Sequence, residues 1–138
     1  MKHLILIVAV ALFIGCEKTA PSQPHPILGD WRVQSCQVSE YADDALVSDY
    51  FTDYSQRNEI IRFIDGGMGV WIHDNIVYKW FSWEIDNQNL LIVEDIGEPL
   101  NYKINMEADI FLYIRESVYN TDLTRNRVVF SYIAYRVN

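Results

Sequence analysis

Few side chains in this 138-residue sequence could do chemistry: three histidines, two cysteines and nineteen carboxylates. His73 precedes Asp74, and a histidine beside a carboxylate is the pairing that a general base requires. Because adjacent strand residues point to opposite faces, we expect the two side chains not to act together. The acidic pairs at 43–44 and 94–95 have no neighbours that would give one carboxyl a separate role. We therefore expect no catalytic site and no enzymatic activity.

The sequence gives no more support for a metal site than for a catalytic one. The cysteines and histidines lack the spacing of zinc ligands. Acidic residues are frequent over 40–53, but they lack the one-three-five spacing and the central glycine of a calcium loop. We interpret them as a solvated acidic face and expect neither a metal nor a cofactor.

The segment 1–15 is typical of a signal peptide. A basic start at Lys2-His3 is followed by an unbroken apolar run over 4–15. As a helix this run would be about 18 Å long, whereas the hydrocarbon core of a bilayer is about 30 Å thick. The length therefore favours a cleaved signal over a membrane-spanning helix.

Residues 13–16, Phe-Ile-Gly-Cys, resemble a bacterial lipobox. The resemblance implies that Cys16 becomes the lipidated N-terminus and anchors the protein in the bacterial cell envelope. Glu17 permits sorting to the outer membrane. The alternative is a plain secretory signal in which Cys16 has no special role. Residues 16–26, with three prolines, are expected to form a flexible tether.

With Cys16 used as the anchor, Cys36 has no partner for a disulfide within the chain. A reactive thiol needs a base or a cation beside it, and its neighbours Ser35 and Gln37 supply neither. We expect a half-buried cysteine in a strand.

The amino-acid composition limits which fold class and which kinds of partner are expected. The formal net charge of −8 argues against nucleic acid and against charge-driven binding to anionic lipid. Half of the residues are hydrophobic and 14% are aromatic, and aromatic residues favour strands. Residues 27–138 are long enough for one domain with its own core.

Short strand patterns separated by Gly, Asn and Asp turns fill this domain. The expected strands are 30–38, 59–64, 69–73, 78–85, 90–94, 100–104, 110–115 and 127–137. Sequential hairpins without long crossovers favour an eight-stranded antiparallel up-and-down β-barrel over a sandwich.

The longest segment between expected strands is 39–58. Leu46, Tyr50 and Tyr54 recur at helical spacing, and Asp43 and Asp44 would lie where a helix dipole favours acidic residues. We predict one or two turns of helix here, which would act as a lid over one end of the barrel.

Residues 28–31, Leu-Gly-Asp-Trp, resemble the glycine-x-tryptophan opening of the lipocalin superfamily. The remainder is similar to small lipocalin-like domains on bacterial lipoproteins of the Bacteroidetes type. The stretches that carry this resemblance are 61–67, 83–86, 90–92, 102–104 and 134–137. It implies that Gly29 and Trp31 form the closed base of the barrel, with Arg136 across the indole ring.

Two non-enzymatic functions follow. In the first, the barrel holds a small apolar ligand. Its predicted lining is Ile61, Phe63, Trp83, Ile85, Tyr102 and Ile104. In the second, these residues pack as a solid core, and the protein has a structural or interaction role. Its outer aromatic side chains would then contact a partner or a glycan. Those outer residues would be Tyr78, Trp80, Tyr119 and Tyr135.

Overall fold

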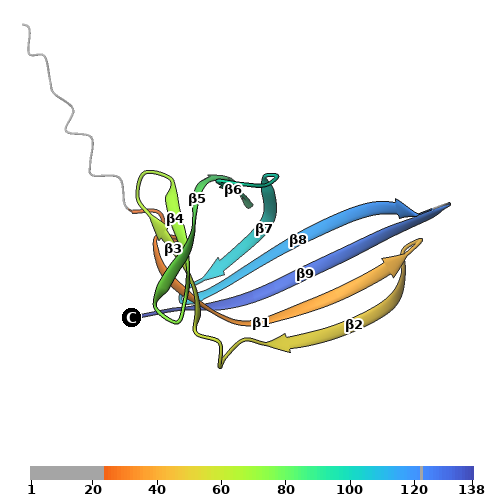
Figure 1. The fold of residues 1–138 in the computed structure, drawn as a ribbon, viewed down its shortest axis with the longest axis horizontal. Coiled ribbons are helices and arrows are strands. Elements are labelled where there is room, and N and C mark those ends of the chain that lie inside the picture. The colour runs from red at the N-terminus through yellow and green to blue at the C-terminus, as the bar shows by residue number, and fades with distance from the viewer. Residues whose placement is uncertain (1–23, 122) are drawn as a thin grey trace, which may run out of the picture.

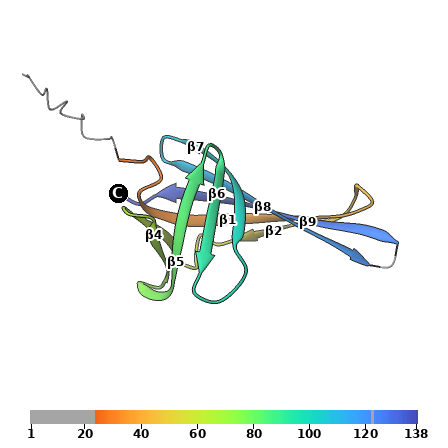
Figure 2. The ribbon, with the colours of Figure 1, turned by 90° about the horizontal axis from the view of Figure 1, so that it is seen from above.

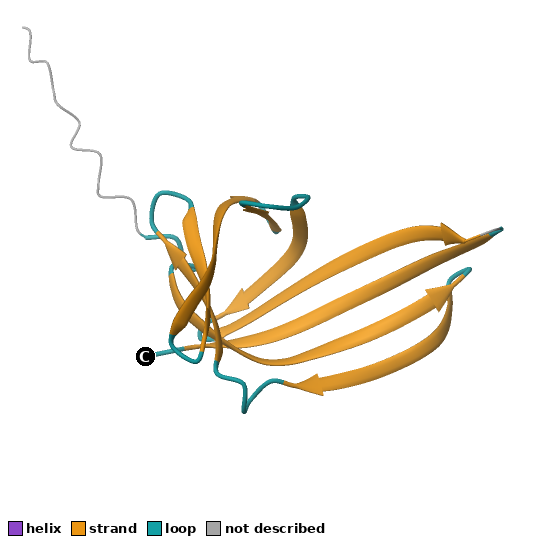
Figure 3. Ribbon diagram, viewed as in Figure 1, coloured by secondary structure: helices purple, strands orange, loops and turns teal. Residues whose placement is uncertain are grey.

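The computed structural model describes residues 24–121 and 123–138, so the predicted signal peptide and Cys16 lie outside the described residues. Within that part the chain forms nine strands and no helix (Figure 3). The strands are β1 (Gly29–Ala42), β2 (Ala45–Asp53), β3 (Glu59–Ile64), β4 (Met68–His73), β5 (Ile76–Asp86), β6 (Asn89–Glu94), β7 (Leu100–Glu107), β8 (Ile110–Thr121) and β9 (Thr124–Arg136).

Eight of these strands close into an antiparallel barrel. From β3 to β9 each strand pairs with the next, and β1 pairs with both β3 and β9, which completes the ring. The prediction of an all-β, eight-stranded antiparallel barrel is confirmed. Two-residue turns close several hairpins: Asp74 and Asn75, for example, take φ angles of 48° and 65°, which Asn and Asp tolerate.

The predicted helix over 39–58 is wrong. β1 continues to Ala42, which pairs with Ala45 at the start of β2. Asp43 and Asp44 between them have φ angles of 47° and 65°, as a two-residue type I′ hairpin turn requires. The two aspartates mark a tight turn, and the apolar residues after them belong to a strand.

This correction adds the ninth strand, β2, which pairs with β1 alone. The last two strands are also longer than predicted. β8 continues to Thr121 and β9 begins at Thr124, where the sequence pattern had indicated a polar loop over 116–126. As a result, four strands extend together beyond the barrel on one side (Figures 1 and 2).

We call this extension the wing. It consists of β2 with the outer parts of β1 (35–42), β8 (115–121) and β9 (124–130), in the order β2–β1–β9–β8. Many of its large apolar side chains are exposed. They include Leu46, Val47, Tyr50, Phe51, Val118 and Tyr119.

The core lies inside the barrel. It is formed by the side chains of Ile27, Trp31, Ile61, Phe63, Phe81, Leu90, Ile92, Tyr102, Ile104, Phe111, Tyr113 and Ala134. Trp31, Ile61, Ile92, Phe111 and Ala134 are completely inaccessible to solvent. Because aromatic side chains supply much of this volume, the interior near the base of the barrel is filled.

Candidate functional site

The base of the barrel is closed around Trp31. Its indole Nε1 donates a 2.7 Å hydrogen bond to the carbonyl oxygen of Ile27, in the segment that enters the barrel. The guanidinium carbon of Arg136 lies 4.2 Å from the centroid of the indole ring, on the neighbouring strand β9. Gly29, with a φ angle of 111°, brings the backbone close to this arginine.

From this base, aromatic rings form a continuous series along one wall. Trp31 contacts Phe111, whose ring is stacked 4.9 Å from that of Tyr113. Tyr113 in turn is stacked on Tyr132, with 4.7 Å between ring centroids and 6° between ring planes. Phe130 continues the series into the wing, 6.5 Å from Tyr132. The wall of the barrel and the wing are thus joined by packed side chains.

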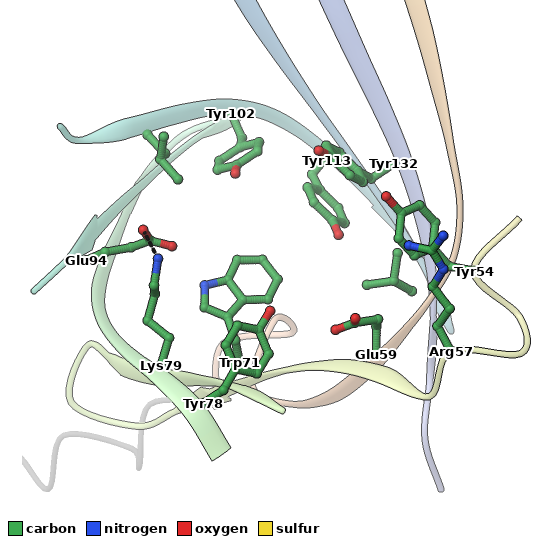
Figure 4. A pocket seen from close by; sticks show the side chains of 12 residues that line it. Tyr54, Arg57, Glu59, Trp71, Tyr78, Lys79, Glu94, Tyr102, Tyr113 and Tyr132 are labelled. Atoms are coloured by element: carbon green, nitrogen blue, oxygen red, sulfur yellow. Dashed lines mark hydrogen bonds and ion pairs between the residues drawn. The ribbon is translucent and has the colours of Figure 1, made fainter. Parts of the chain in front are cut away.

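At the end opposite the base, the barrel opens into a cavity of about 400 Å³ (Figure 4). Six of its lining residues are aromatic: Tyr54, Trp71, Tyr78, Tyr102, Tyr113 and Tyr132. The others are Val33, Arg57, Glu59, Lys79, Glu94 and Leu100. Ligand pockets typically have volumes of about 300–1,000 Å³ and are lined by aromatic residues with a few polar groups, and this cavity fits that description.

The charged side chains of the cavity have partners. Lys79 Nζ lies 2.7 Å from Glu94 Oε2, and only 16% of the Glu94 side chain is exposed. The guanidinium carbon of Arg57 is 4.9 Å from the centroid of the Tyr54 ring. Glu59 Oε1 is 2.9 Å from Nδ1 of His73 at the rim. Each of these side chains therefore has a polar partner or a ring beside it.

One polar group of the cavity has no partner among the described residues. The indole Nε1 of Trp71 is buried and forms no hydrogen bond. Figure 4 shows this nitrogen on the side of the ring that faces Lys79 and Glu94. Leaving a buried N–H without an acceptor costs about 1–3 kcal/mol, so Trp71 is a donor that an added acceptor would satisfy.

Four of the five tyrosines that line the cavity have a pKa above the ordinary value of 10. Burial, aided by Glu59 and Glu94, raises the pKa of Tyr78 to about 12. Burial likewise raises the pKa of Tyr102 and of Tyr132 and raises that of Tyr113 well above the ordinary value of 10. The phenols can therefore donate hydrogen bonds but do not supply charge.

Of the six residues predicted to line a ligand site, only Tyr102 lines this cavity. Ile61, Phe63 and Ile104 belong to the packed core, and Trp83 and Ile85 pack against it. Trp83 also donates a 2.7 Å hydrogen bond to the carbonyl oxygen of Met68. These five residues lie in or against the filled part of the barrel. The hydrophobic alternation of a strand shows which side chains point inward, but it does not show at what depth the interior is open.

Sequence reasoning assigned Tyr78 to the outer surface, yet Tyr78 lines the cavity. The cause is an irregularity in the β4–β5 pairing: Trp71 pairs with Lys79 and Ile72 with Val77, which leaves Tyr78 as an extra residue. Such a bulge breaks the simple alternation of faces. Trp80, Tyr119 and Tyr135, the other residues assigned to the outer surface, are each about half exposed.

His73 does contact Asp74, against the expectation that adjacent residues would diverge. Its Nε2 is 3.3 Å from Asp74 Oδ2, because Asp74 lies in the turn, with a φ angle of 48°, and not in the strand. His73 is thus held between Asp74 and Glu59 at the surface. Cys36 is buried and free, and burial raises the pKa of its thiol.

No group of three or more His, Cys, Asp or Glu side chains that could hold a metal ion occurs among residues 24–121 and 123–138. The same residues contain no apolar helix of the length that a bilayer crossing needs. Comparisons of the chain with protein-family models, with curated proteins and with solved structures find no match.

Proposed function

We propose that this chain is a lipocalin-like lipoprotein of the bacterial cell envelope, anchored through Cys16, whose barrel binds a small hydrophobic ligand. The observation that carries the binding function is the aromatic cavity of about 400 Å³ at the open end of the barrel. The Arg136 guanidinium over the Trp31 ring at the closed base supports the lipocalin-like part of the proposal, because the resemblance implies such a pair. The short apolar run before Cys16 supports the anchor.

The cavity suits a compact apolar molecule better than a long chain. Its depth is limited, because the core below it is filled by Phe63, Phe111 and their neighbours. Six aromatic side chains supply a large apolar contact area that loses little side-chain entropy on binding. A molecule with one or two fused rings would be enclosed on several sides.

Ligand binding is tested with the full lipoprotein in lipid nanodiscs. Small uncharged apolar compounds are dialysed against it, and empty nanodiscs correct for partitioning into lipid. We expect about one molecule bound per chain and a rise in melting temperature. Tyr78→Ala, at the rim of the cavity, should weaken binding, whereas Tyr119→Ala, a comparably exposed tyrosine on the wing, should not. Failure of every compound to bind or to raise the melting temperature would refute the binding function.

The anchor is tested separately. In cells fed an alkyne-labelled fatty acid, the wild-type chain should become labelled and sediment with membranes, and Cys16→Ala should lose both properties. A wild-type chain that is secreted without label would favour the plain secretory signal.

A second candidate function, association with a second copy of the chain, is favoured by the wing. β2 is an edge strand of nine residues without the lysine or proline that commonly protects such edges, and Phe51 on it is 66% exposed. The partner that we assign to this edge is a second copy of the chain. Sedimentation velocity should then detect a dimer that Phe51→Lys dissociates, and a monomer at all concentrations would exclude this candidate.

A further inference from the structure

One unpaired hydrogen-bond donor in the lining of the cavity indicates which kind of ligand the cavity would favour. Trp71 is packed against Phe81, with ring centroids 5.5 Å apart, so the indole is held in one position. Its Nε1–H is buried without an acceptor among the described residues. By contrast, Trp31 and Trp83 each donate a 2.7 Å hydrogen bond to a backbone carbonyl oxygen. Trp71 is therefore an indole donor left unpaired inside the candidate binding site.

An indole N–H can only donate, so the group that satisfies it must be an acceptor. Figure 4 places this nitrogen next to the Lys79–Glu94 pair, across the cavity from Tyr113. Glu94 already accepts from Lys79 at 2.7 Å and is held there by that contact. None of the described residues accepts from Trp71, and a bound ligand with an acceptor atom would fill this role.

The charges around the cavity decide what kind of acceptor is favoured. Lys79 is neutralised by Glu94, and Glu59 adds a further negative charge to the lining. Arg57 lies over the Tyr54 ring, and not beside Trp71 in Figure 4. An anionic group next to Trp71 would meet the carboxylate of Glu94, whereas a neutral carbonyl or ether oxygen would not be repelled.

We propose that the ligand is an uncharged ring compound that carries a neutral oxygen acceptor, and that Trp71 Nε1 donates to this oxygen. The inference rests on the proposed function, since it specifies the ligand class of the same cavity. Trp71 becomes the residue that selects among apolar molecules of similar size. A hydrocarbon of the same shape leaves the indole N–H unpaired and binds more weakly.

The test uses three probes with the same naphthalene skeleton. 2-Acetylnaphthalene carries a carbonyl oxygen, 2-ethylnaphthalene has a CH₂ in its place, and 2-naphthoate carries an anionic carboxylate. Dissociation constants are measured by equilibrium dialysis against the full lipoprotein in nanodiscs, with empty nanodiscs as the reference. We expect 2-acetylnaphthalene to bind roughly tenfold more tightly than 2-ethylnaphthalene, as one additional hydrogen bond predicts.

Trp71→Phe removes the N–H and keeps an aromatic ring. It should abolish the preference for 2-acetylnaphthalene and leave the affinity for 2-ethylnaphthalene nearly unchanged. Trp80→Phe, on the outward side of β5, is the matched control and should retain the preference. In the wild-type protein, the indole Nε1–H resonance of Trp71 should shift downfield with 2-acetylnaphthalene and not with 2-ethylnaphthalene, which tests the contact even if the variant folds poorly.

The outcomes separate the two proposals. Equal binding of the acetyl and ethyl probes, or a preference that survives in Trp71→Phe, would overturn the role of Trp71 and leave the binding function intact. Tighter binding of 2-naphthoate than of 2-acetylnaphthalene would overturn the assignment to neutral ligands. Binding of none of the probes would overturn the binding function together with this inference.

Discussion

Arg136 and Trp31 hold the two ends of the folded chain together. The Arg136 guanidinium carbon lies 4.2 Å from the centroid of the indole ring, and the same group donates to the carbonyl oxygens of Leu28 at 2.9 Å and Pro26 at 2.6 Å. Trp31 meanwhile donates to Ile27 at 2.7 Å. The segment that enters β1 is therefore fixed to the last residue of β9 by hydrogen bonds and by a ring contact, and this closes the base of the barrel.

Trp31→Ala should lower the free energy of unfolding by about 3–5 kcal/mol, as deletion of a fully buried aromatic side chain does. The change also removes the indole N–H that donates to the Ile27 carbonyl and the ring beneath the Arg136 guanidinium, which keeps its hydrogen bonds to Leu28 and Pro26. Urea unfolding followed by circular dichroism measures the loss. Tyr119→Ala, which truncates a half-exposed tyrosine, is the control and should cost much less. Near-wild-type stability of Trp31→Ala would contradict the role of Trp31 as the centre of the base.

Gly69→Ala should destabilise the barrel by about 1–3 kcal/mol, the usual cost of overpacking. A Cβ at this position would overlap the ring of Phe81 and lie 2.7 Å from the carbonyl oxygen of Arg62. Thermal unfolding would show a lower melting temperature. The double variant Gly69→Ala/Phe81→Leu should recover part of the loss, because it removes the ring but not the backbone contact. An unchanged melting temperature in Gly69→Ala would show that β4 and β5 are not packed this closely.

The buried phenol of Tyr113 predicts a loss of stability at alkaline pH. Burial raises its pKa in the folded state well above 10, whereas the unfolded chain releases the proton near 10. The contribution of Tyr113 is therefore complete below about pH 10 and declines as the pH rises through and above that value. Between pH 9 and pH 11, Tyr113→Phe should lose less stability than the wild type in urea unfolding.

Tyr119→Phe, which removes an exposed hydroxyl from the wing, controls for the loss of one phenol. If Tyr113→Phe and the wild type lost stability in parallel over this pH range, Tyr113 would not be buried as the structure has it.

Asp44→Gly tests the hairpin that replaces the predicted helix. Asp44 has a φ angle of 65°, a conformation that glycine adopts without steric cost, and Asp-Gly is a preferred type I′ pair. We expect a gain of about 0.5 kcal/mol, after the larger backbone entropy of glycine is subtracted. In a helix the same substitution would lower stability, so a fall in the melting temperature would argue for the helix.

The barrel was predictable because its turns are explicit. Pairs such as Gly66-Gly67 and Asp74-Asn75 interrupt short apolar runs, and each pair closes a hairpin in the structure. The fully buried Trp31 is also where the sequence pattern indicates a core residue. Local signals of this kind are enough to predict the topology when consecutive strands are neighbours in the sheet.

The wing and the cavity were harder to predict for physical reasons. Most side chains of β2 and of the outer part of β8 are exposed, so these strands lack the alternation that marks a half-buried sheet, and the stretch after Arg115 resembles a loop in composition. The cavity depends on where the interior stops being filled, which is set by packing between distant strands. The bulge at Tyr78 also turns this side chain toward the cavity, whereas simple alternation along the strand assigns it to the outer surface.

The wing extends from the barrel on the side away from the first described residues, which lie next to the base (Figure 1). The cavity likewise opens at the end opposite Trp31. The tether expected before residue 27 would join the proposed anchor at Cys16 to the sealed end of the barrel. The point of attachment would therefore leave the entrance of the cavity and the exposed edge of the wing clear of the tether.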